Sequence, residues 1–172
     1  AEEMYVALEE AYQPDLAGHR HFQLPRGPVP NLPAGCQVVP MVNQVETHAL
    51  FQQAAAHEVM AKYGVVHESW PFAEGRKDFF TNPTLQAIGA KYGKSVAQTA
   101  LRFLIQSDVV VIPKSTHKER MEQNISVFDF TLSYARTVEA IRKLDEGESL
   151  FFSHYDPATV EMLTNMGKTR VV

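Results

Sequence analysis

The sequence predicts an α/β fold in which helices cover a parallel sheet. Two observations support this prediction: short apolar runs alternate with longer segments of helical spacing, and glycine, proline or serine stands at the junctions. The clearest apolar run, at 109–112, ends at Pro113 and indicates a buried strand. With 45% hydrophobic and 21% charged residues, the chain has the composition of a globular domain that buries a core. We expect one domain over residues 1–172.

The first half of the chain contains two predicted strands. Residues 4–12 have helical spacing, and a strand is expected at 38–45. A helix should follow at 49–63, and a second strand at 64–68 that leads into a polar loop. Gly64 can end the helix, because glycine adopts the left-handed conformation at low cost.

Two consecutive helices are expected next. Pro83 suits the first turn of a helix that runs to about Tyr92, and Gly93 can end it. Ser95 can cap a second helix, which runs to about Gln106.

The third strand and two further helices complete the prediction. After the strand at 109–112, a helix should run from 117 or 118 to about 127. Ser133 can cap a last helix that ends near Leu144. The apolar side chains at core spacing are Leu101, Phe103, Leu104, Ile105, Leu132, Val138, Ile141 and Leu144.

Net charge and cysteine content limit the classes of partner. A formal net charge of -4, without a lysine-arginine run, argues against nucleic acid. No stretch approaches the roughly 20 apolar residues that a membrane helix needs, and the acidic start at 1–3 is unlike a signal peptide. Cys36 is the only cysteine, so we expect a cytoplasmic protein without an intrachain disulfide.

The junction after the third strand has the features of an anion site. An anion at this junction would be bound by the first helix amides, by the positive end of the helix dipole and by the ammonium group of Lys114. Arg120 follows in the helix with a planar guanidinium that suits phosphate oxygens. Two cations indicate a doubly charged phosphate. The alternative is that Lys114 and Arg120 are ordinary solvated charges.

The spacing of these residues resembles a known family. A lysine, the next serine, an arginine six residues after the lysine and an asparagine ten residues after it match the clamp for the 2'-phosphate and adenine in aldo/keto reductases. The resemblance implies a (β/α)8 TIM barrel that uses NADP(H) to reduce an aldehyde or ketone. It implies that the clamp comprises Lys114, Ser115, Thr116, Arg120, Gln123 and Asn124.

The similarity extends from Val39 to Pro157. Residues 40–46 resemble the family's sixth strand, so that Gln44 would hold the nicotinamide carboxamide. Residues 67–76 resemble the end of the seventh strand, where Trp70 would stack on the nicotinamide ring. The loop after Trp70 is one residue shorter than the family pattern. The segments 92–103 and 149–157 are similar to the bacterial branch that includes 2,5-diketogluconate reductases.

Only the last three strands of such a barrel can be recognised in the sequence, whereas a complete barrel takes roughly 250 residues. We therefore expect an incomplete, C-terminal portion of the barrel. The family's catalytic aspartate, tyrosine, lysine and histidine have no match here, so no catalytic residue is assigned. Two functions stay open: the cofactor-binding half of an NADP(H)-dependent reductase, or a non-catalytic NADP-binding remnant or scaffold of the same fold.

The segment 13–33 is irregular where the family's fifth strand should lie. With suitable codons, a one-base shift turns the sequence at 19–25 into Ile-Gly-Ile-Ser-Asn-Phe, the family's fifth-strand motif. We hypothesise that residues from about Asp15 to Pro33 are translated out of frame. Loss of that strand would leave the strand at 38–45 with an unpaired edge, so we expect self-association through exposed barrel edges.

Three other motifs favour structural interpretations. The Gly-Lys-Ser at 93–95 follows a predicted helix rather than a strand, which argues against a phosphate-binding loop. Ser153, His154 and Asp156 are too close in sequence to converge as a triad. A last group of histidines and glutamates lacks the spacing of a metal site, so we expect no metal and solvated histidines; its members are His48, His57, His67, Glu46, Glu58 and Glu68.

Overall fold

The computed structural model describes residues 40–70, 79–149, 158, 161–162 and 165. The expectations for 4–12, for 13–33 and for the tail residues 150–157 lie outside the described residues. The described chain forms two compact units. The first contains residues 40–44 and 54–67, and the second contains residues 45–53, 68–70 and 79–149 together with the described positions near the C-terminus.

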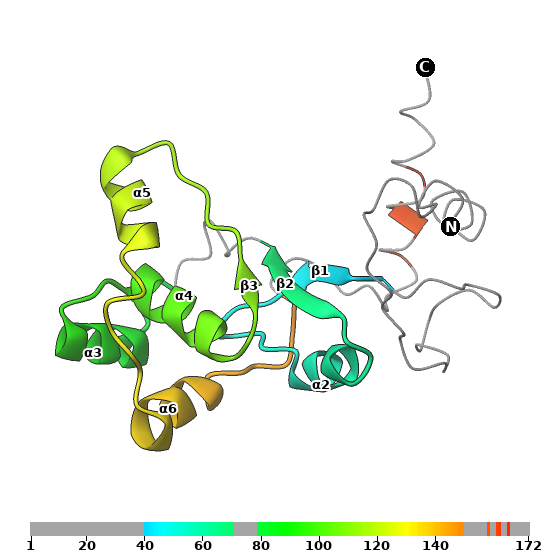
Figure 1. Cartoon of the computed structure of the whole chain (residues 1–172), viewed down its shortest axis with the longest axis horizontal. Coiled ribbons are helices and arrows are strands. Elements are labelled where there is room, and N and C mark those ends of the chain that lie inside the picture. The colour runs from blue at the N-terminus through cyan, green and yellow to red at the C-terminus, as the bar shows by residue number, and fades with distance from the viewer. Residues whose placement is uncertain (1–39, 71–78, 150–157, 159–160, 163–164, 166–172) are drawn as a thin grey trace, which may run out of the picture. The chain divides into compact units, whose positions relative to one another are not determined.

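All three predicted strands are present among the described residues, and they form one sheet in the order β1-β2-β3 (Figure 1). The strands are β1 (Val42–Glu46), β2 (Val66–Trp70) and β3 (Val110–Val111). Strands β2 and β3 run parallel, with Glu68 opposite Val110 and Ser69 opposite Val111. The parallel sheet with crossover helices confirms the α/β prediction.

The helix α2 (Ala54–Lys62) begins five residues later than the sequence predicts. The reason is a tight turn: His48 and Phe51 exchange backbone hydrogen bonds of 2.9 and 3.0 Å, and Gln53 has a positive φ of 53°. Neither feature is compatible with a continuous helix. The predicted left-handed end is confirmed, because Gly64 has a φ of 70°.

The next two helices have the predicted caps. The helix α3 (Pro83–Tyr92) has proline in its first turn and ends at Gly93, whose φ is 64°. The helix α4 (Val96–Gln106) begins with a capping box, in which Ser95 and Gln98 satisfy each other's backbone N–H groups. These ends are set by contacts within three or four residues, which explains why the sequence predicts them.

The last helices differ more from the prediction. The helix α5 (Lys118–Ile125) ends two residues early. After Ser133, residues Tyr134–Val138 form the π-helical segment η1, which continues into α6 (Glu139–Arg142). Ser133 occupies the predicted N-cap position, but its side chain forms no capping hydrogen bond.

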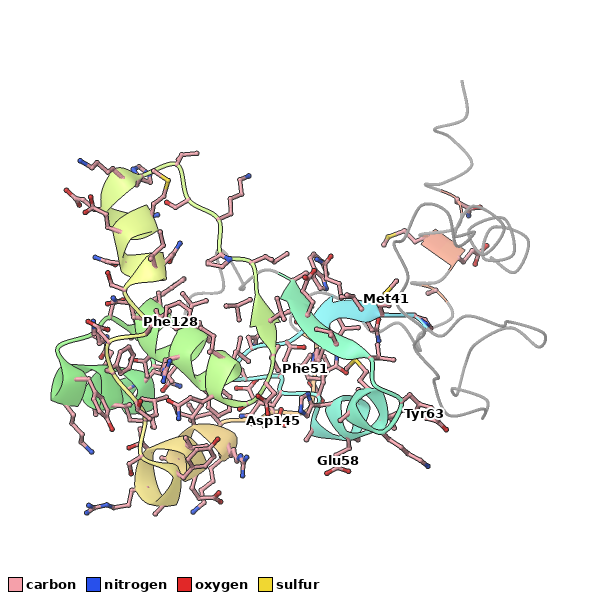
Figure 2. The ribbon with its side chains drawn as sticks, in the orientation of Figure 1. Met41, Phe51, Glu58, Tyr63, Phe128 and Asp145 are labelled. Atoms are coloured by element: carbon pink, nitrogen blue, oxygen red, sulfur yellow. The ribbon has the colours of Figure 1, made fainter. Side chains whose placement is uncertain are left out.

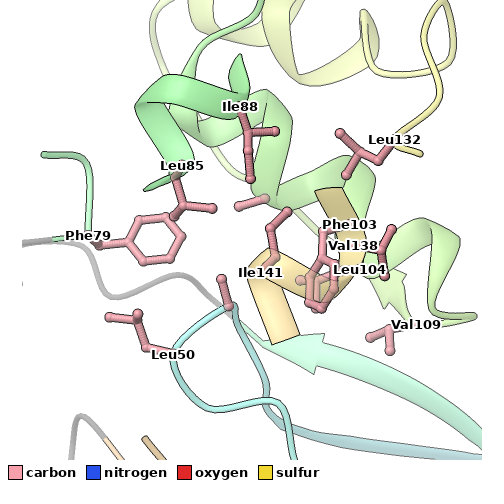
Figure 3. Close-up of a cluster of buried hydrophobic side chains, with 12 residues drawn as sticks. Leu50, Phe79, Leu85, Ile88, Phe103, Leu104, Val109, Leu132, Val138 and Ile141 are labelled. Atoms are coloured by element: carbon pink, nitrogen blue, oxygen red, sulfur yellow. The ribbon is translucent and has the colours of Figure 1, made fainter. Parts of the chain in front are cut away.

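The core of the second unit lies between α3, α4 and the η1–α6 segment. Figure 3 shows Leu85 and Ile88 of α3 facing Phe103 and Leu104 of α4, with Ile141 of α6 beside them. All of these side chains are buried. The predicted core residues Leu101, Phe103, Leu104, Leu132, Val138 and Ile141 are buried, and Ile105 and Leu144 are half-buried.

The prediction of a buried third strand is wrong for part of the run. Val109 is buried, but Val110 and Ile112 are 43% and 47% exposed. Strand β3 pairs with β2, and Val110 lies on the sheet face that also carries its partner Glu68. Helix α4 contacts β3 and covers the opposite face. None of the helices in the described part of the chain is long and apolar enough to cross a membrane.

Candidate cofactor-binding site

The predicted clamp follows β3 and continues into α5. The hydroxyl oxygen of Ser115 accepts a hydrogen bond of 3.1 Å from the backbone N–H of His117, which shapes the entry to the helix. His117 is the N-cap, but its side chain forms no capping bond. No capping bond from the His117 side chain therefore occupies the first amide groups of α5. Lys114, Thr116, Arg120 and Gln123 are exposed, and Ser115 and Asn124 are half-buried.

The two cations of the predicted clamp differ from a neighbouring lysine in their ion pairing. Within the described range 79–149, neither Lys114 nor Arg120 forms an ion pair. The neighbouring Lys118 pairs with Glu122 at 3.9 Å within the helix. Unpaired cations beside a helix N-terminus are the donors that a phosphate group requires.

The carboxyl end of α5 is attached to α4 by polar contacts. Gln98 Nε2 donates to the carbonyl oxygens of Gln123 at 3.2 Å and of Ser126 at 3.0 Å. Lys94 Nζ donates to the same Ser126 oxygen at 3.2 Å and to Asp129 Oδ2 at 2.6 Å. The hydrogen bond from Lys94 lowers the pKa of the Asp129 carboxyl. Sequence reasoning missed this attachment.

These contacts also explain the Gly-Lys-Ser at 93–95. Helix α3 precedes it, Gly93 ends that helix, and Ser95 caps α4. Lys94 is engaged by Ser126 and Asp129. The structural interpretation of this motif is confirmed.

The two predicted nicotinamide contacts lie on the first two strands. Gln44 is an exposed residue of β1 and belongs to the first unit. Trp70 is the half-buried last residue of β2 and belongs to the second unit. Their roles in cofactor binding stay predictions, as do those of the clamp residues.

A buried polar cluster follows β1, and the sequence did not predict it. His48 Nε2 lies 3.1 Å from Glu46 Oε1, and His48 Nδ1 accepts a hydrogen bond from the backbone N–H of Leu50. Ser149 Oγ donates to the other oxygen of the Glu46 carboxylate at 2.5 Å. Burial lowers the pKa of His48 despite the carboxylate. In the sequence, Glu46 and His48 close to a predicted strand end were the signal that could have indicated this cluster.

The prediction of solvated histidines is wrong for His48 and His67, which are both buried. His67 Nδ1 lies 3.0 Å from Nδ1 of the half-buried His57, so one ring nitrogen donates and the other accepts. Burial, helped by His57, lowers the pKa of His67 to about 4. Alternation along β2 turns His67 to the covered side of the strand, which local sequence does not reveal. The described residues contain no group of three or more metal-binding side chains.

The chain belongs to the aldo/keto reductase family, whose family model matches residues 52–146. Methylglyoxal reductase DkgA of Escherichia coli K12 is 40% identical over 114 residues, which are 66% of this chain and 41% of that protein. The chain thus spans about two fifths of the length of the curated relatives that it matches.

Solved structures of aldo/keto reductases share the fold. An enzyme from a Medee basin deep-sea metagenome has a TM-score of 0.67 and 36% identity, over 72% of this chain and 46% of that one. A mutant of Gox0644 in complex with NADPH has a TM-score of 0.61 and 36% identity, over 65% and 41%. The described fold is therefore a partial TIM barrel. The predicted similarity to bacterial members, with a proposed 2,5-diketo-D-gluconic acid reductase B among the structural neighbours, is confirmed.

Proposed function

We propose that this chain binds NADP(H) as the cofactor-binding portion of a reductase that converts aldehydes or ketones to alcohols. The observation that carries the proposal is the pair Lys114 and Arg120, two cations without an ion pair in the described range 79–149, at the open start of α5. The NADPH in the Gox0644 structure supports the choice of dinucleotide.

Each residue of the proposed site supplies one kind of contact. Lys114 and Arg120 would grip the 2'-phosphate, with the hydroxyl groups of Ser115 and Thr116 as further donors. The remaining side chains would hold the two ring systems: Gln123 and Asn124 the adenine, Gln44 the nicotinamide carboxamide, and Trp70 the face of the nicotinamide ring. The bound cofactor supplies the hydride.

The proposal is tested by comparing two dinucleotides on an arginine variant. In Arg120→Ala, the affinity for NADPH should fall by about ten- to a hundredfold, since a charge-assisted contact is lost. The affinity for NADH should stay nearly constant, because NADH lacks the 2'-phosphate. Fluorescence or calorimetric titration of both dinucleotides measures the ratio.

Lys118→Ala is the matched control, because it removes a cation from the same helix that is already paired with Glu122. It should change both affinities little. Equal losses of NADPH and NADH affinity in Arg120→Ala would refute the clamp.

Turnover separates the two functions that the sequence left open. Because no residue of the 172-residue chain is assigned a catalytic role, we expect it to bind NADPH without oxidising it in the presence of an aldehyde. Loss of NADPH absorbance above the background rate would favour the reductase itself over a non-catalytic NADP-binding remnant or scaffold. The cytoplasmic location stays part of this proposal.

We also propose that the incomplete barrel self-associates through an exposed strand edge. Strand β3 lies at an edge of the described sheet, and Val110 within it and Ile112 just after it are exposed. Such an edge favours pairing with another chain. Light scattering after size exclusion should show species larger than 19.3 kDa, and a uniform monomer would contradict this.

A further inference from the structure

Helix α5 carries three residues of the proposed clamp, Arg120, Gln123 and Asn124, yet apolar burial does not hold it in place. None of its residues is buried, and Ile125 is 73% exposed. The segment that follows is anchored by the buried Val127, while Phe128 projects from the loop beyond the helix and is largely exposed (Figure 2). An element with so little buried apolar surface depends on specific polar contacts for its orientation.

The polar contacts lie at one end of the helix. Two donors, the amide of Gln98 in the first turn of α4 and the ammonium of Lys94 in the turn before α4, bind the carbonyl oxygens of Gln123 and Ser126. Helix carboxyl ends leave such carbonyl groups without partners inside the helix, and they carry partial negative charge. The two donors give these carbonyl oxygens hydrogen-bond partners, and the positive charge of Lys94 lies close to their partial negative charge.

The amide of Gln98 also has a fixed orientation. Its Oε1 accepts hydrogen bonds from the backbone N–H of Ser95 at 3.0 Å and from the Ser95 hydroxyl at 3.2 Å. This leaves Nε2 directed to α5, and the side chain as a whole is buried. The Gln98 side chain thus completes the capping box of α4 and also donates to the carboxyl end of α5.

We propose that Gln98 and Lys94 are positioning residues, which set the affinity for the 2'-phosphate by holding α5 and its Arg120 in the binding orientation. This inference rests on the proposed function. Neither residue is among the proposed cofactor contacts. A helix released at its carboxyl end spends less time in the competent orientation, and the apparent dissociation constant rises in proportion.

Gln98→Glu separates the two tasks of this side chain. A glutamate keeps the oxygen that accepts from Ser95 and is favoured at this position of a capping box. It lacks the amide donor, and its charge opposes the carbonyl oxygens of Gln123 and Ser126. Lys94→Met removes the second donor while it retains the length of the side chain.

Gln106→Glu is the matched control at the other end of α4. Gln106 Oε1 accepts from the backbone N–H of Leu132 at 2.7 Å, and its Nε2 donates to the carbonyl oxygen of Leu132 at 3.1 Å. The substitution therefore makes the same chemical change, at a contact with the chain after α5 rather than with α5 itself.

The experiment measures two quantities on the full chain. The first is amide hydrogen exchange without cofactor: Gln98→Glu and Lys94→Met should lose protection in α5 while α3 and the rest of α4 keep theirs. The second is the affinity for NADPH, which should fall by roughly tenfold if the competent orientation drops to about a tenth of its population. Gln106→Glu should leave both quantities unchanged.

Unchanged exchange in α5 would overturn the inference, and so would lost protection with an unchanged affinity for NADPH. A variant that loses protection throughout the chain, α3 included, would show a general structural role and overturn it as well. A wild-type chain that binds neither dinucleotide would refute the proposed function. The exchange measurement would then still decide whether Gln98 and Lys94 hold α5.

Discussion

The cluster between α3, α4 and α6 and the clamp helix α5 belong to the same unit but are held by different forces. In the cluster, side chains such as Leu85, Leu104 and Ile141 are almost fully buried. In α5, no side chain is buried, and the Gln98 side chain of α4 binds carbonyl groups at its carboxyl end. We expect the first region to tolerate polar changes at its surface and the second region to be sensitive to the loss of single donors.

Truncation of a buried side chain should give the largest effect on stability. Leu104 of α4 is 1% exposed, so Leu104→Ala should lower the free energy of unfolding by about 2–5 kcal/mol. Ile125→Ala in α5 should change it by less than about 0.5 kcal/mol, because Ile125 is 73% exposed. Urea denaturation measures both. Similar losses in the two variants would erase the distinction between the regions.

Acid should destabilise the folded state, because two of its histidines are buried in the neutral form. Burial lowers the pKa of His48 and of His67, the latter from 6.5 to about 4. Between these values the unfolded chain binds more protons than the folded one. The contribution of these histidines to the free energy of unfolding should therefore be complete above pH 6.5. It should decrease as the pH drops towards 4, by at most about 1.4 kcal/mol per pH unit for each proton.

Urea denaturation at a series of pH values measures this slope. His67→Asn keeps an oxygen that can accept from His57 but does not titrate, so its slope should be shallower than that of the wild type. An equal slope in the two proteins would place the acid sensitivity elsewhere.

A methyl group at Gly89 should destabilise the junction between α3 and α4. Exposed glycine-to-alanine changes within helices usually add about 1 kcal/mol of stability. Here the added Cβ would collide with the carbonyl oxygen of Lys94 and lie 3.0 Å from the Thr99 hydroxyl. Gly89→Ala should instead lower the free energy of unfolding by about 1–3 kcal/mol. A rise in melting temperature would contradict the close approach.

The smallest expected effects distinguish two serines in N-cap positions. Ser95 accepts a hydrogen bond from the backbone N–H of Gln98, whereas Ser133 forms no side-chain capping bond. Ser95→Ala should lower the free energy of unfolding by about 1 kcal/mol, and Ser133→Ala should change it little. Thermal or urea denaturation of both variants measures the difference. Equal losses would mean that the sequence pattern alone predicts a cap.

The amino-acid sequence by itself determined the order of the elements and several of their ends. Pro83, Gly93, Gly64 and Ser95 act as predicted, because caps and left-handed turns depend on neighbours within about four residues. The family resemblance has the same basis, since the spacing from Lys114 to Asn124 lies within one strand-to-helix junction.

The tertiary structure alone decided which polar groups are buried and what holds the clamp helix. His48 and His67 look like surface histidines in the sequence, and Gln98 looks like a local capping residue. The Gln98 side chain binds carbonyl groups 25 and 28 positions away in the sequence. Periodicity and capping patterns describe interactions along one segment. Contacts between segments depend on how the segments pack, and that is where the proposed support of the clamp lies.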